Sequence, residues 1–594
     1  MTIGNRAASQ FRAGILAGLA HAGLMALAFP RPGLWPFALV AITPLVLAAR
    51  NVTNHRRRAL GVALGSLPFW AFTHWYIGAI TEAGLPVLLV YLSLWPGLFV
   101  WVMSRVPLPE GAHVPWARIM LPAIVWTVIE SVRAQWVWDG YAWYLVGQPL
   151  IDSSATLLAP WFGLHAPSLL AAAFGSAVAL VVAEVATTYR PGVRAPARQI
   201  RLGVVLLVVF ILLLLPFRPS GWAGDDRSQT LRLAAVQTNV PQSNKMSPPF
   251  EQRMADFSAA LRLTSEAAHI DDEPGSTKPD AIFWPETSFP GTSLSPEVVE
   301  AERASGLGYR AHNYPLTGWY DDLVRIQRDL GVPMVVGATA AEGFTISQEP
   351  GMPMFQFDRT FNSAFLIREG AVQPERTDKV HLTPFGETMP LISNWPWLEQ
   401  RLLALGASGM TFDLSRGIAR PLAIPLGEGR APLHVAVPIC FEATIPHVVR
   451  DQVYPRDGSL PRAGLIANLS NDAWLGESVT ARLNHLLAAR WRCVELGVPM
   501  IRAANSGASC FIDASGRLRQ LGPNDAEPLD DSLAPPRPAH GALVEGAMSV
   551  TVNVVQPPDG ARPPWLPRLL EVLLPTLGTL LIFARAWLGW RTRR

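Results

Sequence analysis

Cysteine is scarce in this chain, which holds three, Cys440, Cys493 and Cys510, among 594 residues. Three thiols in so long a chain form no disulfide framework, and no CxxC pair or Cys/His spacing indicates zinc. We therefore predict no metal site and expect each cysteine to be either a packing residue or a reactive thiol. For Cys493 and Cys510 we favour packing, because a lone buried cysteine usually behaves as a small apolar residue.

Charge is also sparse, since charged residues make up 16% of the chain and the formal net charge is +3. A nucleic-acid-binding protein needs clustered Lys and Arg on a soluble face, so this balance gives no support to that class. Hydrophobic residues make up 50% of the chain. A chain this long and this apolar indicates more than one domain and a part that lies in a membrane.

Apolar runs of bilayer length fill residues 1–218, and one more lies in residues 564–594. A helix needs about 20 apolar residues to cross a bilayer. The first run is followed by others, so we interpret it as a retained span and not as a signal peptide. We predict seven transmembrane helices in 1–218 and an eighth, with a short basic tail, in 564–594. The runs are Ala13–Phe29, Leu34–Ala49, Leu60–Ala79, Leu85–Val106, Ala117–Trp136, Pro167–Val185, Leu202–Phe217 and Leu569–Leu588.

Arginine clusters in the loops predict the orientation, because positive charge collects on the cytoplasmic side of a bacterial inner membrane. With the N-terminus inside, the clusters at 50–58, 190–201 and 591–594 all lie on that side, and Arg31 is a lone exception. Residues 219–563 then lie outside, on the periplasmic side of a multi-pass inner-membrane protein.

Residues 219–563 change to short strand-like runs that alternate with amphipathic helical stretches, which is typical of an α/β domain. Helices are predicted at Glu251–Ala268, Asp321–Gly331 and Thr480–Gly497. The predicted strands are Leu231–Val236, Ala281–Trp284, Met334–Ala338, Asn362–Ile367, Leu433–Ile439, Leu465–Leu469, Met500–Ala504, Cys510–Asp513 and Met548–Val554.

Three segments of this domain place a reactive side chain at or near the end of a strand-like run, where loops converge on a site. IFWPE ends in Glu286, DKVHLTPFGE holds Lys379 and Glu387, and VPICFE holds Cys440 and Glu442. A cysteine nucleophile needs a base to remove its proton. A nearby cation favours the thiolate and stabilises the oxyanion that forms on a carbonyl. Glu, Lys and Cys can supply these three functions.

The three segments resemble the Glu–Lys–Cys triad of the nitrilase superfamily. Together with seven preceding spans and one following span, they make nearly the whole chain similar to the apolipoprotein N-acyltransferase family. Further matching stretches are Val236–Gln242, Ser470–Gly476 and Arg502–Gly507. The resemblance implies a multi-pass α-helical membrane domain of about eight spans, joined to an external nitrilase-like αββα sandwich.

The resemblance also implies roles for individual residues. Glu286 would be the general base, Lys379 the oxyanion-stabilising cation and Cys440 the nucleophile. Supporting residues implied in the same way are Glu387 and Glu442, which position Lys379 and Glu286, Phe441, whose backbone N–H completes the oxyanion hole, and Trp474, near the lipid-binding pocket. His381 and His485 we interpret as hydrogen-bonded structural residues, since no metal spacing accompanies them.

The reaction implied by the resemblance is transfer of a fatty acyl group from a membrane phospholipid, at the sn-1 position of phosphatidylethanolamine. The group passes through a thioester on Cys440 to the N-terminal amine of the diacylglyceryl-cysteine of an apolipoprotein. The expected partners are these two substrates and membrane lipid, with no nucleic acid and no cofactor. A membrane-tethered amidase that uses water, and a scaffold with an inactive domain, remain as alternatives. The eight predicted spans and the complete triad favour the acyltransferase.

The sequence departs from the family pattern at two single residues and in two loops. Phe441 stands where the family often has Tyr, so the ring is kept and the hydroxyl is not. Met246 stands where an aromatic residue is expected, which bears on substrate gating. Extra length is expected in loops at Glu300–Asp321 and Arg517–Ala539.

Overall fold

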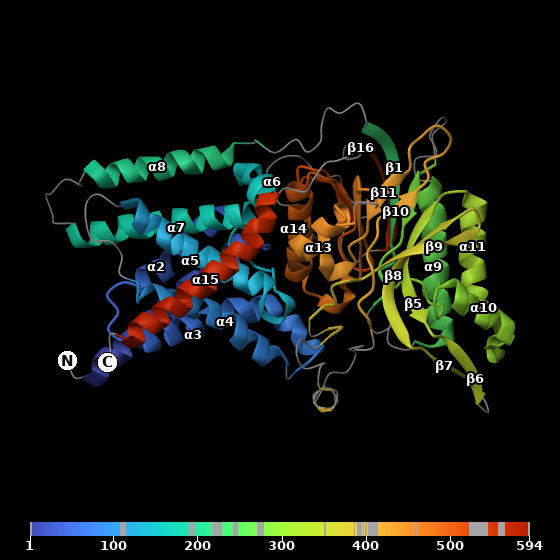
Figure 1. The fold of residues 1–594 in the computed structure, drawn as a ribbon, viewed down its shortest axis with the longest axis horizontal. Coiled ribbons are helices and arrows are strands. Elements are labelled where there is room, and N and C mark those ends of the chain that lie inside the picture. The colour runs from blue at the N-terminus through green and yellow to red at the C-terminus, as the bar shows by residue number, and fades with distance from the viewer. Residues whose placement is uncertain are drawn as a thin grey trace. The chain divides into compact units, whose positions relative to one another are not determined.

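The chain divides into two compact units, a helical one and an α/β one (Figure 1). The first unit holds the described helices before residue 216 and the last helix of the chain, and the second holds the described strands and helices between Ser228 and Val555. The computed structural model describes residues 3–591 except for 83, 107–114, 189–196, 216, 218–227, 242–247, 270–277, 350–351, 385, 389–394, 396, 398–400, 402–413, 458–459, 522–544 and 556–564.

The first unit places a helix at nearly every predicted apolar run. The exception is Leu34–Ala49, which is not one helix but two short ones, η1 (Trp35–Val40) and α2 (Thr43–Ala48). Pro44 explains the break, because a proline in the first turn starts a helix but its ring prevents the preceding one from continuing. The long helices are α1 (Ile3–Ala28), α3 (His55–His74), α4 (Gly84–Met103), α5 (Pro115–Gln135), α7 (His165–Thr188), α8 (Ala197–Leu214) and α15 (Trp565–Arg591).

Three helices of the described residues are long and apolar enough to cross a membrane: Ala7–Ala28, Gly84–Met103 and His165–Ala186. Two further apolar stretches, Trp35–Ala48 and Arg201–Leu214, are shorter. The predicted total of about eight spans therefore stays a prediction.

Helices α1 and α3 pack closely through glycines spaced four apart on both. A Cβ added to Gly61 would overlap the carbonyl oxygen of Phe11, and one added to Gly65 would overlap that of Ile15. Gly14 and Gly18 meet the backbone of α3 in the same way. This small-residue spacing lets two helix backbones approach without a hydrophobic driving force, which is how helices associate in lipid.

The second unit contains two six-stranded sheets. In each, three neighbouring strands are parallel, β1, β2 and β5 in the first sheet and β11, β12 and β13 in the second. The first sheet has the order β16 (Gly546–Val555), β1 (Ser228–Gln237), β2 (Ala281–Phe283), β5 (Met334–Glu342), β8 (Arg359–Arg368) and β9 (Ala371–Asp378). The second has the order β10 (Leu422–Ile424), β11 (Leu433–Ala436), β12 (Leu465–Ser470), β13 (Met500–Ala504), β14 (Cys510–Ile512) and β15 (Leu518–Leu521).

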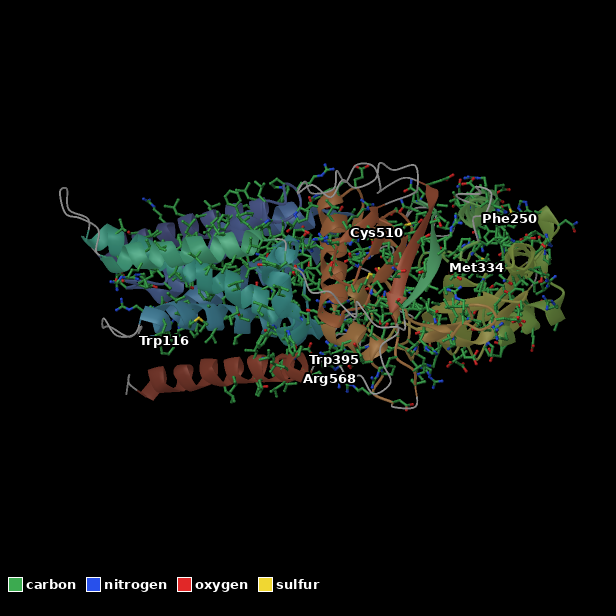
Figure 2. The ribbon with its side chains drawn as sticks, turned by 90° about the horizontal axis from the view of Figure 1, so that it is seen from above. Trp116, Phe250, Met334, Trp395, Cys510 and Arg568 are labelled. Atoms are coloured by element: carbon green, nitrogen blue, oxygen red, sulfur yellow. The ribbon has the colours of Figure 1, made fainter. Side chains whose placement is uncertain are left out.

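The two sheets face each other and helices cover both outer faces, so the layers run helix, sheet, sheet, helix (Figure 1). Apolar side chains of both sheets form the central core. Helices α9 (Phe250–His269) and α11 (Gly318–Leu330) cover the first sheet, and α13 (Pro446–Val453) and α14 (Val479–Leu496) cover the second. A second apolar cluster lies between the first sheet and its helices, and a third lies between the second sheet and its helices. Figure 2 labels Phe250 and Met334 in the former and Cys510 in the latter.

Every predicted strand and helix of this unit is present, although Leu433–Ile439 is shortened to β11. The predicted loop at Glu300–Asp321 is wrong. It contains the end of α10 (Pro296–Ser305), a hairpin of β3 (Gly308–Tyr309) and β4 (Tyr314–Pro315), and the start of α11. In the second predicted loop, β15 occupies the beginning and residues 522–539 lie outside the described residues, as does Met246.

Candidate functional site

Glu286 lies just beyond the carboxyl end of β2, and its side chain is buried. Both carboxylate oxygens accept hydrogen bonds. Asn362 Nδ2 donates to Oε1 at 2.6 Å, and the backbone N–H of Asn471 donates to Oε2 at 2.8 Å. Gly337 of β5 lies directly against this turn, where a Cβ would overlap the carbonyl oxygen of Pro285. The carboxylate is therefore fixed by groups from both sheets before any substrate binds.

Lys379 follows β9 and is 1% exposed. Its Nζ lies 2.7 Å from Oε2 of Glu387 and 3.4 Å from Oε1 of Glu286. Burial alone would lower the pKa of Lys379, but the charges of Glu387 and then Glu286 raise it above its ordinary value. Lys379 is thus a buried cation at neutral pH.

Glu387 is the closest anion to that cation. Burial would raise its pKa, but Lys379 and the N–H of Thr383, which donates to Oε2 at 2.8 Å, hold it below the ordinary value. Asn362 Nδ2 also reaches Glu387 Oε1, at 3.4 Å. Asn362 therefore links the two carboxylates that flank Lys379.

Cys440 begins a short 3₁₀ helix, η9 (Cys440–Thr444), after β11 in the second sheet. Its φ is +53°, a left-handed conformation that non-glycine residues rarely adopt and that concentrates at functional sites. Burial, and then the charge of Glu286, raise the pKa of the Cys440 thiol above its ordinary value, while Lys379 lowers it. All three predicted triad residues thus meet, with the glutamate and lysine supplied by the first sheet and the cysteine by the second.

Glu442 is completely buried and accepts four N–H groups. Its Oε1 accepts from the backbone of Val380 at 2.7 Å and of His381 at 2.9 Å. Its Oε2 accepts from the backbone of Ile439 at 2.8 Å and from Gln452 Nε2 at 3.2 Å. Burial raises the pKa of Glu442 to about 7, although these bonds lower it. Glu442 therefore joins the backbone next to Lys379 to the backbone next to Cys440.

Phe441 and Trp474 lie on the two short helices beside the triad. The buried ring of Phe441 stacks at a centroid distance of 6.3 Å from the ring of His381. Trp474 is half-buried on η10 (Asp472–Leu475), three residues after the Asn471 N–H that binds Glu286.

The three further stretches singled out in the sequence also meet here. Asn505 accepts from Thr238 Oγ1 at 2.7 Å and from the backbone N–H of Val240 at 2.8 Å, and it donates to Asn471 Oδ1 at 2.9 Å. One amide side chain thus connects the start of the domain to the loops after β12 and β13. All three stretches are thus joined through the side chain of Asn505.

Two groups that contact Glu286 were absent from the prediction, the side chain of Asn362 and the backbone N–H of Asn471. Asn362 had a signal, since a polar amide begins the strand-like run Asn362–Ile367. The backbone N–H of Asn471 could not be predicted from the sequence, because nearly every residue type carries such a group.

Family models match both units. The apolipoprotein N-acyltransferase N-terminal domain matches residues 21–177, and the carbon-nitrogen hydrolase model matches residues 232–528. Among solved structures, an amidase of the nitrilase superfamily from Nesterenkonia AN1 is similar at 15% identity and a TM-score of 0.32, over 54% of this chain and 90% of that one.

Curated relatives are similar over most of their length. An apolipoprotein N-acyltransferase of Rhizobium meliloti is 30% identical over 549 residues, which cover 85% of this chain and 86% of the relative. Those of Geobacter metallireducens and Bordetella bronchiseptica are 27% and 29% identical, over 84% of this chain and 85% and 87% of theirs. With both domain models and these full-length relatives matched, the chain belongs to the apolipoprotein N-acyltransferase family.

Proposed function

We propose that this protein transfers a fatty acyl group from a membrane phospholipid to the N-terminal amine of diacylated apolipoproteins, the last step of lipoprotein maturation. The observation that carries the proposal is the buried Lys379 cation between Glu387 and Glu286, acting on the thiol of Cys440, in a member of this family. Cys440 is the acyl carrier in this proposal, and the reaction is ping-pong.

The directions of the pKa shifts support the proposed roles. The pKa of Lys379 is raised, which suits a residue that keeps its proton and acts as the cation. The thiol of Cys440 is also protonated, since burial raises its pKa, and it needs a base at the moment of attack. Glu286, held in place by Asn362 and the N–H of Asn471, is the carboxylate suited to receive that proton.

In the first step Glu286 takes the thiol proton while the sulfur attacks an ester carbonyl carbon, at sn-1 of phosphatidylethanolamine. Negative charge develops on the carbonyl oxygen, where Lys379 and the backbone N–H of Phe441 stabilise it. The carbon–oxygen ester bond then breaks, and Glu286 returns the proton to the leaving glycerol oxygen. Lysophospholipid departs and a thioester remains on Cys440.

In the second step the α-amine of the diacylglyceryl-cysteine attacks the thioester. Glu286 accepts a proton from the amine, the carbon–sulfur bond breaks, and the proton passes to the departing sulfur. The products are the N-acylated lipoprotein and the free thiol of Cys440. Neither step needs a metal or a cofactor.

The proposal gives a physical reason for the helical unit. Both substrates carry acyl chains, and lifting a chain out of lipid costs about 0.8 kcal/mol per CH₂. A site that works at the membrane surface avoids this cost. We therefore propose about eight spans in the bacterial inner membrane, residues 219–563 on the periplasmic side, and Trp474 near the acyl chains, where a large half-buried ring can contact lipid.

Intact mass tests the proposal. Purified protein exposed to phosphatidylethanolamine should gain one acyl group that hydroxylamine removes, and Cys440→Ala should gain none. A diacylated lipopeptide should discharge the adduct and become N-acylated. No adduct on folded wild-type protein, or an adduct that persists in Cys440→Ala, would remove Cys440 as the carrier.

Water in place of the amine would make the protein a membrane-tethered amidase or hydrolase. The match of residues 21–177 to the acyltransferase N-terminal domain favours the amine. The two are separated by following the adduct without lipopeptide, because a hydrolase would release free fatty acid at the rate of turnover, whereas the acyltransferase would hold its thioester.

A further inference from the structure

The peptide group between Cys440 and Phe441 is held from its carbonyl side. The Cys440 carbonyl oxygen accepts from Nε2 of His485, at 3.2 Å, and from Nδ2 of Asn468, at 3.3 Å. The N–H of the same peptide belongs to Phe441. Because a carbonyl that accepts hydrogen bonds makes the N–H of its own amide a stronger donor, these contacts bear directly on the proposed oxyanion hole.

The surroundings of His485 assign a proton to Nε2. The Cys440 carbonyl can only accept, so Nε2 must donate. On the other side of the ring, Nδ1 lies 3.0 Å from Asp472 Oδ1 and 3.2 Å from Arg502 Nη2. Whether Nδ1 donates to Asp472 or accepts from Arg502, the proton on Nε2 is required. The ring is 0% exposed, so water does not replace this bond.

Behind the ring, Asp472 and Arg502 fix its position. Arg502 Nη2 donates to both oxygens of Asp472, at 2.9 and 2.7 Å, and Ser470 Oγ donates to Oδ1 at 2.7 Å. Burial would raise the pKa of Asp472, but Arg502 and His485 hold it well below its ordinary value. Gly507 packs so closely that a Cβ there would overlap the Asp472 carboxylate. Asp472 is therefore a buried anion held in place by Arg502 and Ser470.

We propose that His485, oriented by Asp472 and Arg502, is a positioning residue that aligns and polarises the Cys440–Phe441 peptide so that the Phe441 N–H serves the oxyanion. The inference rests on the proposed function for the identity of the oxyanion donor. It assigns the orientation of His485 to Asp472 and Arg502. These two residues lie in the stretches Ser470–Gly476 and Arg502–Gly507, which resemble the family. It also adds a role to His485, which the sequence indicated as a hydrogen-bonded structural residue.

Two reactions of the same thiol test the proposal in the detergent-solubilised full chain. Acylation by a p-nitrophenyl ester develops an oxyanion, whereas alkylation by iodoacetamide displaces iodide and develops none. His485→Leu removes the donor and should slow the acylation burst about 10- to 100-fold, less than the 10²–10³ typical of deleting an oxyanion donor outright. Alkylation should stay within about twofold of wild type, because the thiol and its base are untouched.

His485→Gln restores a hydrogen-bond donor, since the glutamine amide nitrogen lies as many bonds from the backbone as Nε2 of histidine. This variant should recover most of the acylation rate that His485→Leu loses. Cys493→Ala is the matched control for a buried change on α14, and both rates should be unchanged. Equal loss of acylation and alkylation in His485→Leu, no loss of acylation, or a Gln variant no better than Leu would each overturn the proposal.

The ester also separates the two proposals. Wild-type protein that reacts with the p-nitrophenyl ester but not with phosphatidylethanolamine would refute the lipid donor, while the comparison of His485 variants would still stand.

Discussion

The Nζ of Lys379 lies 2.7 Å from Glu387 and 3.4 Å from Glu286. The lysine is therefore paired mainly with a carboxylate that is not the proposed base. Glu286 keeps Oε1 within reach of Lys379 but takes its shorter bonds from Asn362 and Asn471, both neutral donors. Glu286 is thus held at its shortest contacts by neutral donors, while Lys379 is held chiefly by Glu387.

Glu387→Gln removes the closer anion, and Lys379 should then pair with Glu286. We expect acylation of Cys440 by phosphatidylethanolamine to slow about 10- to 100-fold, because a base bound to a cation is a weaker proton acceptor. Single-turnover mass spectrometry measures this rate. Glu300→Gln, the same change at an exposed position of α10, should leave it unaltered. An unaltered rate in Glu387→Gln would contradict the pairing described above.

Glu286→Gln should separate the reactivity of the thiol from catalysis. The charge of Glu286 raises the pKa of Cys440, so its removal should move the pH profile of iodoacetamide alkylation to lower pH. Acyl transfer should nevertheless fall by about 10²–10⁴, the usual contribution of a general base. Lys379→Met should move the alkylation profile the other way, since Lys379 lowers the pKa of Cys440. Shifts in the same direction for both variants would refute this electrostatic account.

Gly337→Ala tests how tightly the base is held. A Cβ at this position would overlap the carbonyl oxygen of Pro285 and press on Cα of Glu286, so the turn must move. Catalytic geometry tolerates little displacement, and a shift of about 1 Å can cost a factor of about 100 in rate. We expect a comparable loss of acyl transfer. Gly23→Ala, on α1 where an added Cβ meets nothing within 4 Å, is the control and should be fully active.

Glu442 should make stability depend on pH. Its pKa is raised from 4.5 to about 7, so between these values the folded protein binds more protons than the unfolded chain. The contribution of Glu442 to the free energy of unfolding is fully present at a pH below the pKa of the unfolded chain. It is lost as the pH rises through about 7, and the total loss is about 3 kcal/mol.

In Glu442→Gln this dependence disappears, and one acceptor for the four N–H groups is also lost. The variant should be less stable than wild type at pH 5, and the gap in thermal unfolding temperature should narrow at pH 8. A gap that widens with pH would show that the pKa of Glu442 is lowered on folding. The exposed Glu300→Gln should show no such trend.

Strands that are buried on both faces were predictable because apolar residues dominate their sequences, although Asn468 interrupts β12 and Arg502 interrupts β13. Strand β9 was missed although Lys379 follows it directly. It lies at the edge of its sheet and includes Gln373, Pro374 and Glu375, so no apolar pattern marks it. The hairpin of β3 and β4 was missed for a related reason, since strands of two residues have no period to detect.

At the site, motifs predicted which residue types would meet but not which atoms would touch. Glu442 was expected to support the triad by positioning Lys379 and Glu286. Its carboxylate accepts from the backbone N–H groups of Val380 and Ile439, contacts that no residue pattern encodes. The contact of His485 with the Cys440 carbonyl is likewise created by the approach of α14 to η9. Such contacts arise from packing between segments far apart in sequence.

The pairing of β1 with β16 affects how the α/β unit could be exchanged between related proteins. These strands come from the two ends of the unit and run antiparallel along their whole length, with Ser228 opposite Val555. The chain therefore enters and leaves the unit at adjacent points. The two points at which the unit is joined to the rest of the chain are therefore neighbours. An exchange of this unit between relatives would therefore need to match the chain at only two neighbouring points, next to Ser228 and Val555.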